Sequence, residues 1–249
     1  MNKVALITGS SRGMGKAEAF EFAKNGYDVI INYVKSAQKA EEIKNEIEKE
    51  YGVKVISIQA DLAKEEDIIK LVNEAYKEFG HIDVLVNNAG IAPYGPMEEK
   101  TIFTFENTMK INFYAPFLLT KLIAPKMMEQ KYGKIVNIST IDVMKSYNAE
   151  SAEYDASKAA LISFTKTSAL AYQPYVNVNC VCPGWIHTDM TEQNGEDLNN
   201  FFLSKIAKQR FGKPEEIAKV VRFLCSDDAD YIDGEVICVD GGFKNIWLI

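Results

Sequence analysis

Seven short apolar runs, separated by stretches long enough for helices, constrain the fold of this chain more than any other feature of its sequence. The runs span residues 3–8, 29–33, 53–60, 82–87, 134–139, 176–181 and 236–239, and helical segments span 14–25, 36–51, 64–79, 101–130, 151–172 and 214–226. This alternation predicts repeated strand–helix–strand units and a parallel sheet. The runs at 4–7 and 135–138 are almost continuously apolar, which is typical of strands buried on both faces. We therefore expect a doubly wound α/β fold, with helices on both faces of a seven-stranded parallel sheet.

The chain shows no sign of a division into parts. Its 249 residues contain no linker, internal repeat or shift in composition, so we predict a single domain over residues 1–249. One irregular stretch, 184–212, is long, polar in its middle and placed after a strand, and we interpret it as a substrate lid. No stretch approaches the roughly 18 uninterrupted apolar residues of a membrane span, and the N-terminus lacks the pattern of an export signal. We expect neither membrane insertion nor export.

Charge and cysteine content narrow the function further. The 28 basic and 35 acidic residues give a net charge of −7, and the basic residues are scattered among acidic ones, which disfavours nucleic-acid binding. Four cysteines without repeated spacing are typical of reduced thiols in a cytoplasmic enzyme. Cys180 and Cys182 share one face of a predicted buried strand, and we interpret them as packing residues. With only His81 and His187 as further partners, we expect no metal site.

A glycine-rich loop connects the first predicted strand to the first helix, with the sequence Thr8-Gly9-Ser10-Ser11-Arg12-Gly13-Met14-Gly15. Glycines let the backbone approach a pyrophosphate, and the N-terminus of the helix offers unpaired N–H groups and the positive end of its dipole. A nucleoside-triphosphate P-loop is excluded, because Ser10 occupies the place of its first glycine and Ala17 that of its magnesium-binding Ser or Thr. The position of the loop instead predicts a Rossmann-type dinucleotide site formed by Gly9, Ser11, Arg12, Gly13, Met14 and Gly15. A plain tight turn is the alternative.

The end of the second strand bears on the choice of cofactor. It carries Asn32 and Tyr33 and no carboxylate, whereas NAD-selective sites generally use one to bind the adenosine ribose. Arg12 lies in the loop near that ribose, and a guanidinium without a competing carboxylate favours the 2′-phosphate of NADP. We therefore predict NADP(H) in preference to NAD(H), with Asn32 and Tyr33 among the contacts. The alternative is that Arg12 only covers solvent.

Tyr154 and Lys158 are four residues apart near the start of a predicted helix, which places both side chains on one face. Several polar motifs accompany this pair in order: Asn87-Asn88-Ala89-Gly90, Asn112, Ser139-Thr140 and Pro183-Gly184-Trp185-Ile186-His187-Thr188. With these motifs the chain resembles the short-chain dehydrogenase/reductase family from Lys3 to Phe243. The stretch 210–217 and the ending Val239-Asp240-Gly241-Gly242 are most similar to its 3-oxoacyl-[acyl-carrier-protein] reductase and glucose dehydrogenase branches. The resemblance implies an oxidoreductase that moves a hydride between nicotinamide and a carbonyl or secondary alcohol, with activity like that of a 3-oxoacyl-thioester reductase.

The resemblance also implies four catalytic residues: Asn112, Thr140, Tyr154 and Lys158. Tyr154 is expected to give the proton during reduction or take it during oxidation, and Lys158 to stabilise the phenolate and hold the nicotinamide ribose. Asn112 is expected to interrupt its helix and to anchor a water on the proton path to Lys158; an Asn that merely bends the helix is the alternative. The family usually carries Ser where Thr140 stands. Because strand alternation lets only one of Ser139 and Thr140 face the substrate, we predict Thr140, with Ser139 as the alternative.

Further residues are expected to line the cofactor by the same resemblance. Asp61 and Leu62 follow the third strand and would contact the adenine, although a helix N-cap is another possible role for Asp61. The remaining expected contacts are Asn88, Ala89 and Gly90 on the adenosine side, and Pro183, Gly184, Ile186 and Thr188 beside the nicotinamide.

The expected partners are a small carbonyl or alcohol substrate and further copies of the chain, because the family that it resembles is mostly tetrameric. The last seven residues contain five large apolar side chains, which we expect to be buried against a neighbouring subunit or within their own. The short connection 172–175 lacks the basic residue typical of acyl-carrier-protein reductases, which disfavours docking of an acidic carrier protein. The alternative functions are a sugar or polyol dehydrogenase and a non-catalytic dinucleotide sensor.

Overall fold

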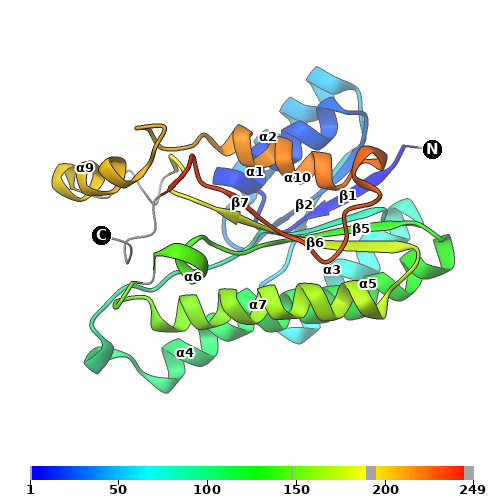
Figure 1. Cartoon of the computed structure of the whole chain (residues 1–249). Helices are drawn as coiled ribbons and strands as arrows, with labels where there is room; N and C mark the ends of the chain where they lie inside the picture. Colours follow the sequence, from blue (N-terminus) through cyan, green and yellow to red (C-terminus); the bar gives the residue numbers. More distant parts are fainter. Residues whose placement is uncertain (1, 147, 189–194, 244–249) are drawn as a thin grey trace.

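A seven-stranded parallel sheet forms the centre of the molecule (Figure 1), as seen in a computed structural model that describes residues 2–146, 148–188 and 195–243. The strand order is β3-β2-β1-β4-β5-β6-β7, and every neighbouring pair is parallel. The strands are β1 (Val4–Ile7), β2 (Asp28–Tyr33), β3 (Val55–Gln59), β4 (Val84–Asn87), β5 (Gly133–Ile138), β6 (Val176–Pro183) and β7 (Val236–Val239). The predicted doubly wound α/β fold is confirmed.

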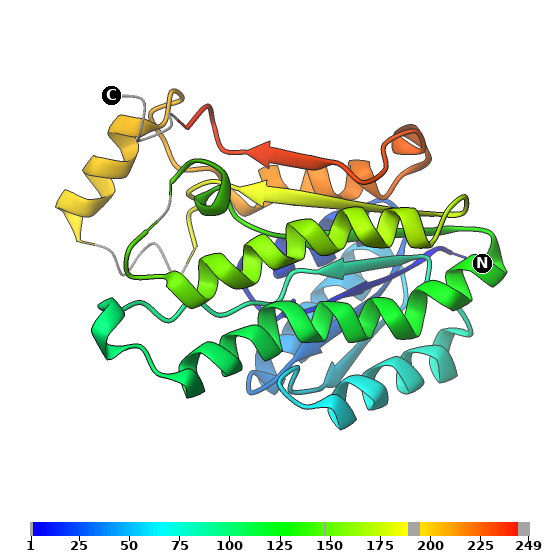
Figure 2. The same cartoon turned by 60° about the horizontal axis from the view of Figure 1, so that its bottom comes forward.

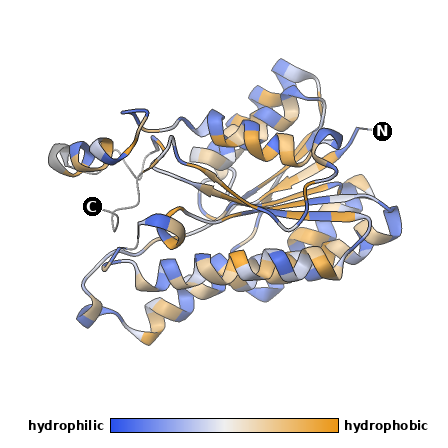
Figure 3. Ribbon diagram, in the orientation of Figure 1, coloured by the Kyte–Doolittle hydropathy of each residue, from blue (hydrophilic) through white to orange (hydrophobic). Residues whose placement is uncertain are grey.

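Helices cover both faces of this sheet. One face carries α1 (Gly13–Lys24), α2 (Ala37–Tyr51) and α10 (Pro214–Leu224); the other carries α3 (Glu65–Phe79), α5 (Ala115–Gln130) and α7 (Ala152–Ala171). Their inward sides pack on the strands in two separate apolar cores, and the strands show the most hydrophobic colouring in Figure 3. Burial on both faces explains why the strands are almost continuously apolar in sequence.

The strand order places a ligand site at one end of the sheet. The chain runs outward from β1 to β2 and β3, then returns to the other side of β1 as β4. At such a reversal the connections leave in opposite directions and open a crevice beyond the carboxyl ends of the strands. Figure 2 shows the strands pointing towards this end, where the short helix α6 (Asp142–Lys145) and α9 (Glu196–Lys205) also lie.

The predicted helix over 101–130 is interrupted in its middle. Helix α4 (Ile102–Met109) begins at a capping box between Thr101 and Thr104, and a single π-helical turn, η2 (Lys110–Tyr114), joins it to α5. Asn112 is fully buried in this turn. The structure thus shows the local interruption that the resemblance implied at Asn112.

The stretch 184–212 contains a helix that the sequence analysis did not predict. Helix α9 brings Phe202 onto Trp185, with ring centroids 3.5 Å apart, and Ile186 forms an isolated bridge with Gly212. These contacts tie both ends of the stretch together. Two further short turns, η1 (Met97–Glu99) and η3 (Asp227–Ala229), were also not predicted.

Part of the lid and the apolar tail after Phe243 fall within 189–194 and 244–249, outside the described residues. Among the helices that the structure does describe, none combines the length and apolar character needed to cross a membrane.

Candidate active site

The glycine-rich segment from the end of β1 to the first turn of α1 forms a backbone cradle that is closed to a side chain at Gly15. Gly9 has a φ of +65°, in the left-handed region that favours glycine. At Gly15, a Cβ atom would come within 2.6 Å of the Asn88 amide nitrogen and 2.7 Å of the Gly9 carbonyl oxygen. The N-cap residue of α1, Arg12, makes no capping hydrogen bond through its side chain. First-turn N–H groups that no side chain caps suit an anion.

The turn after β4 is fastened to this loop. The hydroxyl of Thr8 accepts hydrogen bonds from the backbone N–H groups of Asn88 and Ala89, both at 3.0 Å. The Asn88 side chain donates to the Thr8 carbonyl at 2.8 Å. Asn88, Ala89 and Gly90 therefore lie against the cradle, as expected of residues that line the nucleotide.

The end of β2 differs in detail from the expectation. Asn32 is buried, and its side chain accepts from the Gly9 N–H at 3.2 Å and donates to the Ala60 carbonyl at 3.1 Å. It therefore braces the cradle from inside the protein. Tyr33 is half-buried, whereas Arg12 and the neighbouring cation Lys35 are exposed. The sequence analysis did not single out Lys35, although its place two residues beyond the strand could have revealed it.

Asp61 and Leu62 follow β3, as predicted, but Asp61 is not a helix N-cap. Helix α3 begins at Glu65 with Lys64 as its N-cap. Asp61 instead accepts a hydrogen bond from the Ala63 N–H at 3.1 Å, which makes a tight turn, and Leu62 is buried in the core. The suggested N-cap role of Asp61 is therefore wrong, because three residues separate it from the helix.

Tyr154 and Lys158 lie on the same side of α7, and the Lys158 ammonium stands 5.8 Å from the centre of the Tyr154 ring. Lys158 is 3% exposed and donates to the Ile138 carbonyl at 2.7 Å. Its Nζ atom is also 3.2 Å from where a Cβ atom on Gly90 would stand. The amine thus reaches across the end of β5 towards the turn after β4.

Burial dominates the ionisation of this pair. It lowers the pKa of Lys158 to about 8, because a charged amine loses hydration inside the protein. Burial, followed by the negative charge of Asp142, raises the pKa of Tyr154 above its ordinary value, and a hydrogen bond with Thr140 opposes that rise. In the described chain, Tyr154 is therefore a protonated phenol, the form that a proton donor to a carbonyl requires.

Asn112 connects three elements from within the π turn. Its side-chain oxygen accepts from the Ile91 N–H at 2.9 Å, and its side-chain nitrogen donates to the Ile91 carbonyl at 2.9 Å and to the Ser157 hydroxyl at 3.0 Å. The same oxygen is 3.4 Å from the Cβ position on Gly90 that Lys158 also approaches. Asn112 and Lys158 therefore face the same small space above Gly90.

The two hydroxyls after β5 point in different directions. Ser139 is 3% exposed, and its hydroxyl donates to the Lys158 carbonyl at 3.0 Å, within the fold. The Thr140 hydroxyl donates to the Asp142 carboxylate at 3.2 Å and hydrogen-bonds with Tyr154. This arrangement favours Thr140 as the residue that faces a substrate.

The predicted nicotinamide contacts gather where β6 ends. The Pro183 carbonyl accepts from the Ile141 N–H at 3.1 Å, and the Gly184 N–H donates to the Val239 carbonyl at 3.0 Å. Ile186 is buried, and a Cβ atom on Gly13 would lie 3.9 Å from the Thr188 methyl. Thr188 thereby links this segment to the phosphate cradle.

Two carboxyl groups beside Tyr154 were not predicted from the sequence. Asp142 lies in α6, two residues beyond Thr140, and Asp155 follows Tyr154 directly. Burial and the charge of Asp155 raise the pKa of Asp142 to about 6. Asp155 is 8% exposed, and one of its oxygens has no hydrogen-bond partner in the described structure. In the sequence, the only sign of Asp142 and Asp155 was that each lies close to a predicted hydroxyl-bearing residue. An analysis of hydrophobic periodicity does not detect such a sign.

The carboxyl ends of the strands therefore hold two adjoining parts of one site. The glycine-rich cradle adjoins the N-terminus of α1, and the hydroxyl of Thr140, the phenol of Tyr154 and the amine of Lys158 lie near one another at the end of β5. The steric exclusion at Gly15 and the N-terminus of α1 fit a pyrophosphate, and the Lys158 amine near Tyr154 suits the hydroxyl groups of a ribose. We find that the residues present suit a nicotinamide dinucleotide.

Comparisons with known proteins agree with this geometry. The family model described as enoyl-(acyl carrier protein) reductase matches residues 9–244. The chain is 43% identical over 241 residues to the 3-oxoacyl-[acyl-carrier-protein] reductase FabG of Aquifex aeolicus, covering 96% of each chain.

Solved structures are similar over nearly the whole chain. A blue fluorescent protein from a metagenomic library, in complex with NADPH, has a TM-score of 0.91 and 35% identity, covering 97% of each chain. The L-sorbose reductase of Gluconobacter frateurii, complexed with NADPH and L-sorbose, has a TM-score of 0.90 and 31% identity, covering 97% of this chain and 96% of its own.

Proposed function

The chain belongs to the short-chain dehydrogenase/reductase family, and we propose that it is an NADP(H)-dependent reductase of carbonyl groups, with 3-oxoacyl thioesters as the favoured substrate class. It is an oxidoreductase that acts on a carbonyl or the corresponding alcohol and uses a nicotinamide cofactor. The observation that carries the proposal is the meeting of Thr140, Tyr154 and Lys158 at the end of β5, opposite the glycine cradle. The 43% identity to a 3-oxoacyl-[acyl-carrier-protein] reductase supports the substrate class.

In the proposed reaction, the chain holds the substrate and delivers a proton. A bound nicotinamide supplies the hydride. Thr140 donates a hydrogen bond to the substrate carbonyl oxygen, and Tyr154 transfers its phenolic proton to the same oxygen as negative charge develops there. Lys158 stabilises the resulting phenolate electrostatically and holds the cofactor ribose. Asn112 positions the path by which a proton returns to Lys158.

The remaining predicted residues are assigned to the cofactor. Gly9, Ser11, Gly13, Met14 and Gly15 would cradle the pyrophosphate, and Asp61, Leu62, Asn88, Ala89 and Gly90 the adenosine side. Pro183, Gly184, Ile186 and Thr188 would orient the nicotinamide. Asn32 supports the cradle through its bonds to Gly9 and Ala60, so we assign it a positioning role.

We further propose that NADP(H) is preferred over NAD(H). The support is the exposure of Arg12 and Lys35 beside the end of β2, together with the absence of a carboxylate at Asn32 and Tyr33. A titration by cofactor fluorescence should give tighter binding of NADPH than of NADH. Tyr33→Asp should move the preference towards NADH, since its carboxylate repels the 2′-phosphate and can bind the ribose. Tighter NADH binding by the unmodified protein would contradict the assignment.

A sugar or polyol dehydrogenase is the second candidate. Asp142 and Asp155 place hydrogen-bond acceptors next to Thr140 and Tyr154, and acceptors suit substrates with several hydroxyl groups. The structural similarity to an L-sorbose reductase also favours this candidate.

The proposal extends to location and assembly. All four cysteines are free, which supports a reducing, cytoplasmic setting. We propose one domain with 184–212 as its lid, and a homotetramer as the assembled state. Two separate apolar surfaces support the tetramer: Ile102, Phe103, Tyr114 and Phe117 on one side, and Phe223 and Tyr231 on the other. A tetramer with dihedral symmetry needs more than one interface.

Purified protein assayed with NADPH or NADP⁺ against ketones, 3-oxoacyl thioesters, aldoses and polyols tests the function directly. We expect reduction of a 3-oxoacyl thioester, followed as loss of NADPH absorbance. A preference for aldoses or polyols would select the second candidate. Turnover of none of these compounds would leave the dinucleotide sensor as the better assignment.

A further inference from the structure

The hydroxyl of Thr140 has a single hydrogen and more than one group that can accept it. It donates to Oδ2 of Asp142 at 3.2 Å and itself accepts from the Asp142 N–H at 3.2 Å. Tyr154 is a further hydrogen-bond partner. A hydroxyl has one donor and two acceptor positions, so Thr140 cannot donate to Asp142 and to a substrate carbonyl at the same time.

The surroundings of Asp142 raise the pKa of its carboxyl group. Asp155 and Tyr154 face it from α7, and Tyr94 faces it from the loop after β4. The nearest cation of its own helix, Lys145, is bound to Asp240 at 2.6 Å beside the end of β7. Desolvation and the charge of Asp155 together raise the pKa of Asp142 to about 6, against the hydrogen bond from Thr140, which lowers it.

The two forms of Asp142 present Thr140 differently. An ionised carboxylate only accepts hydrogen bonds, so it holds the Thr140 hydrogen and leaves an acceptor lone pair for the substrate. A protonated carboxyl can donate to Thr140, which then has both lone pairs occupied and its hydrogen free. The first arrangement binds an alcohol, and the second binds a carbonyl oxygen.

We propose that Asp142 is a positioning residue whose protonation decides whether Thr140 donates its hydrogen to a substrate carbonyl or withholds it. Through this exchange, protonation of Asp142 strengthens the hydrogen bond from Thr140 to the negative charge that develops on the substrate oxygen in the transition state, which speeds carbonyl reduction and the reverse oxidation alike. The inference rests on the proposed function, since it assigns Thr140 to the substrate oxygen.

A pH profile tests the inference. The probe is acetoacetyl-N-acetylcysteamine with NADPH, between pH 5 and 8. In the unmodified protein, kcat/KM for reduction should fall on the order of tenfold as pH rises through about 6, the value of one lost hydrogen bond in the transition state. Asp142→Asn stays neutral, so this step should vanish and reduction at pH 8 should exceed that of the unmodified protein. Asp142→Leu, which neither accepts nor donates, should behave in the same way.

Matched variants separate this role from a structural one. Asp155→Asn should keep the step but move it to lower pH, because the charge that raises the pKa of Asp142 is gone. Thr140→Ser keeps a hydroxyl and should keep the step. In Thr140→Val, the residual activity should show no step, and adding Asp142→Asn should change nothing further. A step that persists in Asp142→Asn would overturn the inference.

The titration of Asp142 can also be followed without an activity assay, through the pH dependence of the melting temperature. Because the pKa of Asp142 is raised in the folded state, the stability linked to it is present at low pH and is lost as pH rises through about 6. The melting temperature of Asp142→Asn should therefore exceed that of the unmodified protein increasingly up to about pH 6, then stay constant. A pH-independent difference overturns the inference.

The two measurements also distinguish which idea has failed. Reduction by the unmodified protein with a flat pH profile overturns the role of Asp142 alone. No turnover of any carbonyl overturns the proposed function and the role of Asp142 with it.

Discussion

Three side chains assigned to the proposed chemistry, those of Asn112, Thr140 and Lys158, are almost completely removed from water. Lys158 is 3% exposed, yet its amine must keep a charge beside Tyr154. Its pKa of about 8 means that it is charged at neutral pH and begins to lose its proton just above. Oxidation, which needs the Tyr154 phenolate, thus depends on a cation that weakens as pH rises.

The roles of Tyr154 and Lys158 can be separated by mutation. Tyr154→Phe removes only the acidic hydrogen and should abolish nearly all turnover while leaving NADPH affinity close to normal. Lys158→Ala should reduce both turnover and affinity, because the amine also holds the ribose. Steady-state kinetics and a fluorescence titration measure the two effects.

The choice between Ser139 and Thr140 can be tested in the same assays. Ser139→Ala should remain active, since the Ser139 hydroxyl bonds to the Lys158 carbonyl within the fold. An inactive Ser139→Ala alongside an active Thr140→Val would reverse the assignment of the substrate hydroxyl.

The buried carboxyl group of Glu18 is expected to reduce the stability of the fold. It lies in α1 with no exposed surface, both carboxyl oxygens lack a hydrogen-bond partner in the described structure, and burial raises its pKa. Glu18→Leu should therefore increase the free energy of unfolding by about 1–3 kcal/mol. The gain should be larger at pH 8 than at pH 5, since a raised pKa costs stability as pH rises through it. Urea unfolding at both pH values measures this, with Glu42→Leu on the exposed side of α2 as the control; equal gains at both sites would contradict the explanation.

Sequence patterns identify which residue types meet in the site better than they identify side-chain direction. Helical spacing predicts that Tyr154 and Lys158 share one face, the family resemblance selects this pair, and the structure places the two side chains together. Asn32 was expected to contact the ribose, but its two hydrogen bonds to Gly9 and Ala60 turn it inward. Adjacent strand residues face opposite sides of a sheet. Which of the two faces the ligand depends on how the strand pairs with its neighbours, and this pairing is not read from the sequence pattern.

Among the elements, the first turn of α1 leaves little room for change at Gly15. A methyl group at Gly15 would overlap Asn88, Gly9 and Ser10, with separations of 2.6 to 2.9 Å. Gly15→Ala should lower the free energy of unfolding by about 1–3 kcal/mol, a typical cost of overpacking, and should weaken NADPH binding because the cradle must open. Calorimetry and fluorescence titration test both effects. As a control, Lys16→Ala changes an exposed neighbour and should alter neither the free energy of unfolding nor the affinity for NADPH. Normal NADPH affinity in Gly15→Ala would contradict the assignment of the cradle to the cofactor site.

The long helices were predictable because their burial repeats with a regular period, and the strands because they are short and almost continuously apolar. The strands lie within two residues of their predicted bounds. Helix α9 was missed because its apolar residues do not show a clear helical period. The position of Phe202 depends instead on stacking against Trp185, which lies earlier in the sequence. Helix α6 has four residues, too few for any periodic signal, although it carries Asp142.

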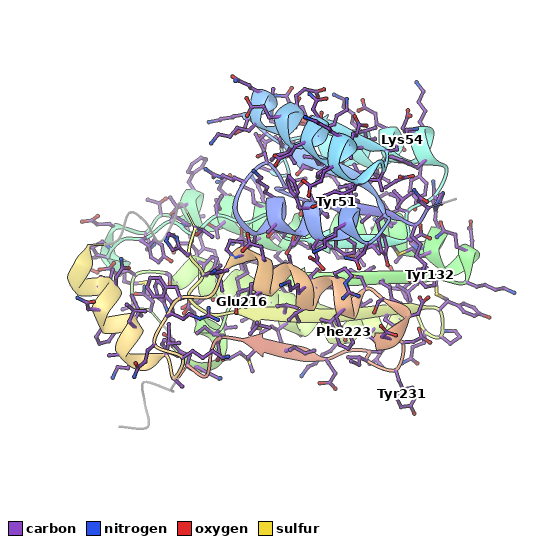
Figure 4. The ribbon with its side chains drawn as sticks, turned by 90° about the horizontal axis from the view of Figure 1, so that it is seen from above. Tyr51, Lys54, Tyr132, Glu216, Phe223 and Tyr231 are labelled. Atoms are coloured by element: carbon purple, nitrogen blue, oxygen red, sulfur yellow. The ribbon has the colours of Figure 1, made fainter. Side chains whose placement is uncertain are left out.

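At the scale of the whole molecule, exposed apolar side chains predict how copies meet. Ile102 and Phe103 of α4 are 76% and 77% exposed, and Tyr231 near β7 is fully exposed and points outward in Figure 4. Exposed apolar clusters of this kind commonly mark protein interfaces.

Phe103→Asp and Tyr231→Asp should each reduce the assembled mass from tetramer to dimer, because each places a charge in one of two different interfaces. Light scattering measures the mass, and Lys126→Asp, on α5, serves as a control for added negative charge. Deleting residues 244–249 should also weaken the assembly if the apolar tail joins an interface. Fully tetrameric Phe103→Asp and Tyr231→Asp proteins with unchanged melting temperature would argue against both surfaces.

The π turn at Lys110–Tyr114 limits how this chain can change during evolution. A π turn amounts to one additional residue within a helix, and each helical residue rotates the side chains beyond it by about 100°. Deleting Asn112 would restore a regular helix, but would swing the exposed face of α4 around relative to α5 and detach Ile91 from its two hydrogen bonds. A lineage that acquired this extra residue could not lose it by a single deletion without also changing the outer surface of α4. We therefore expect the insertion, once acquired, to be retained.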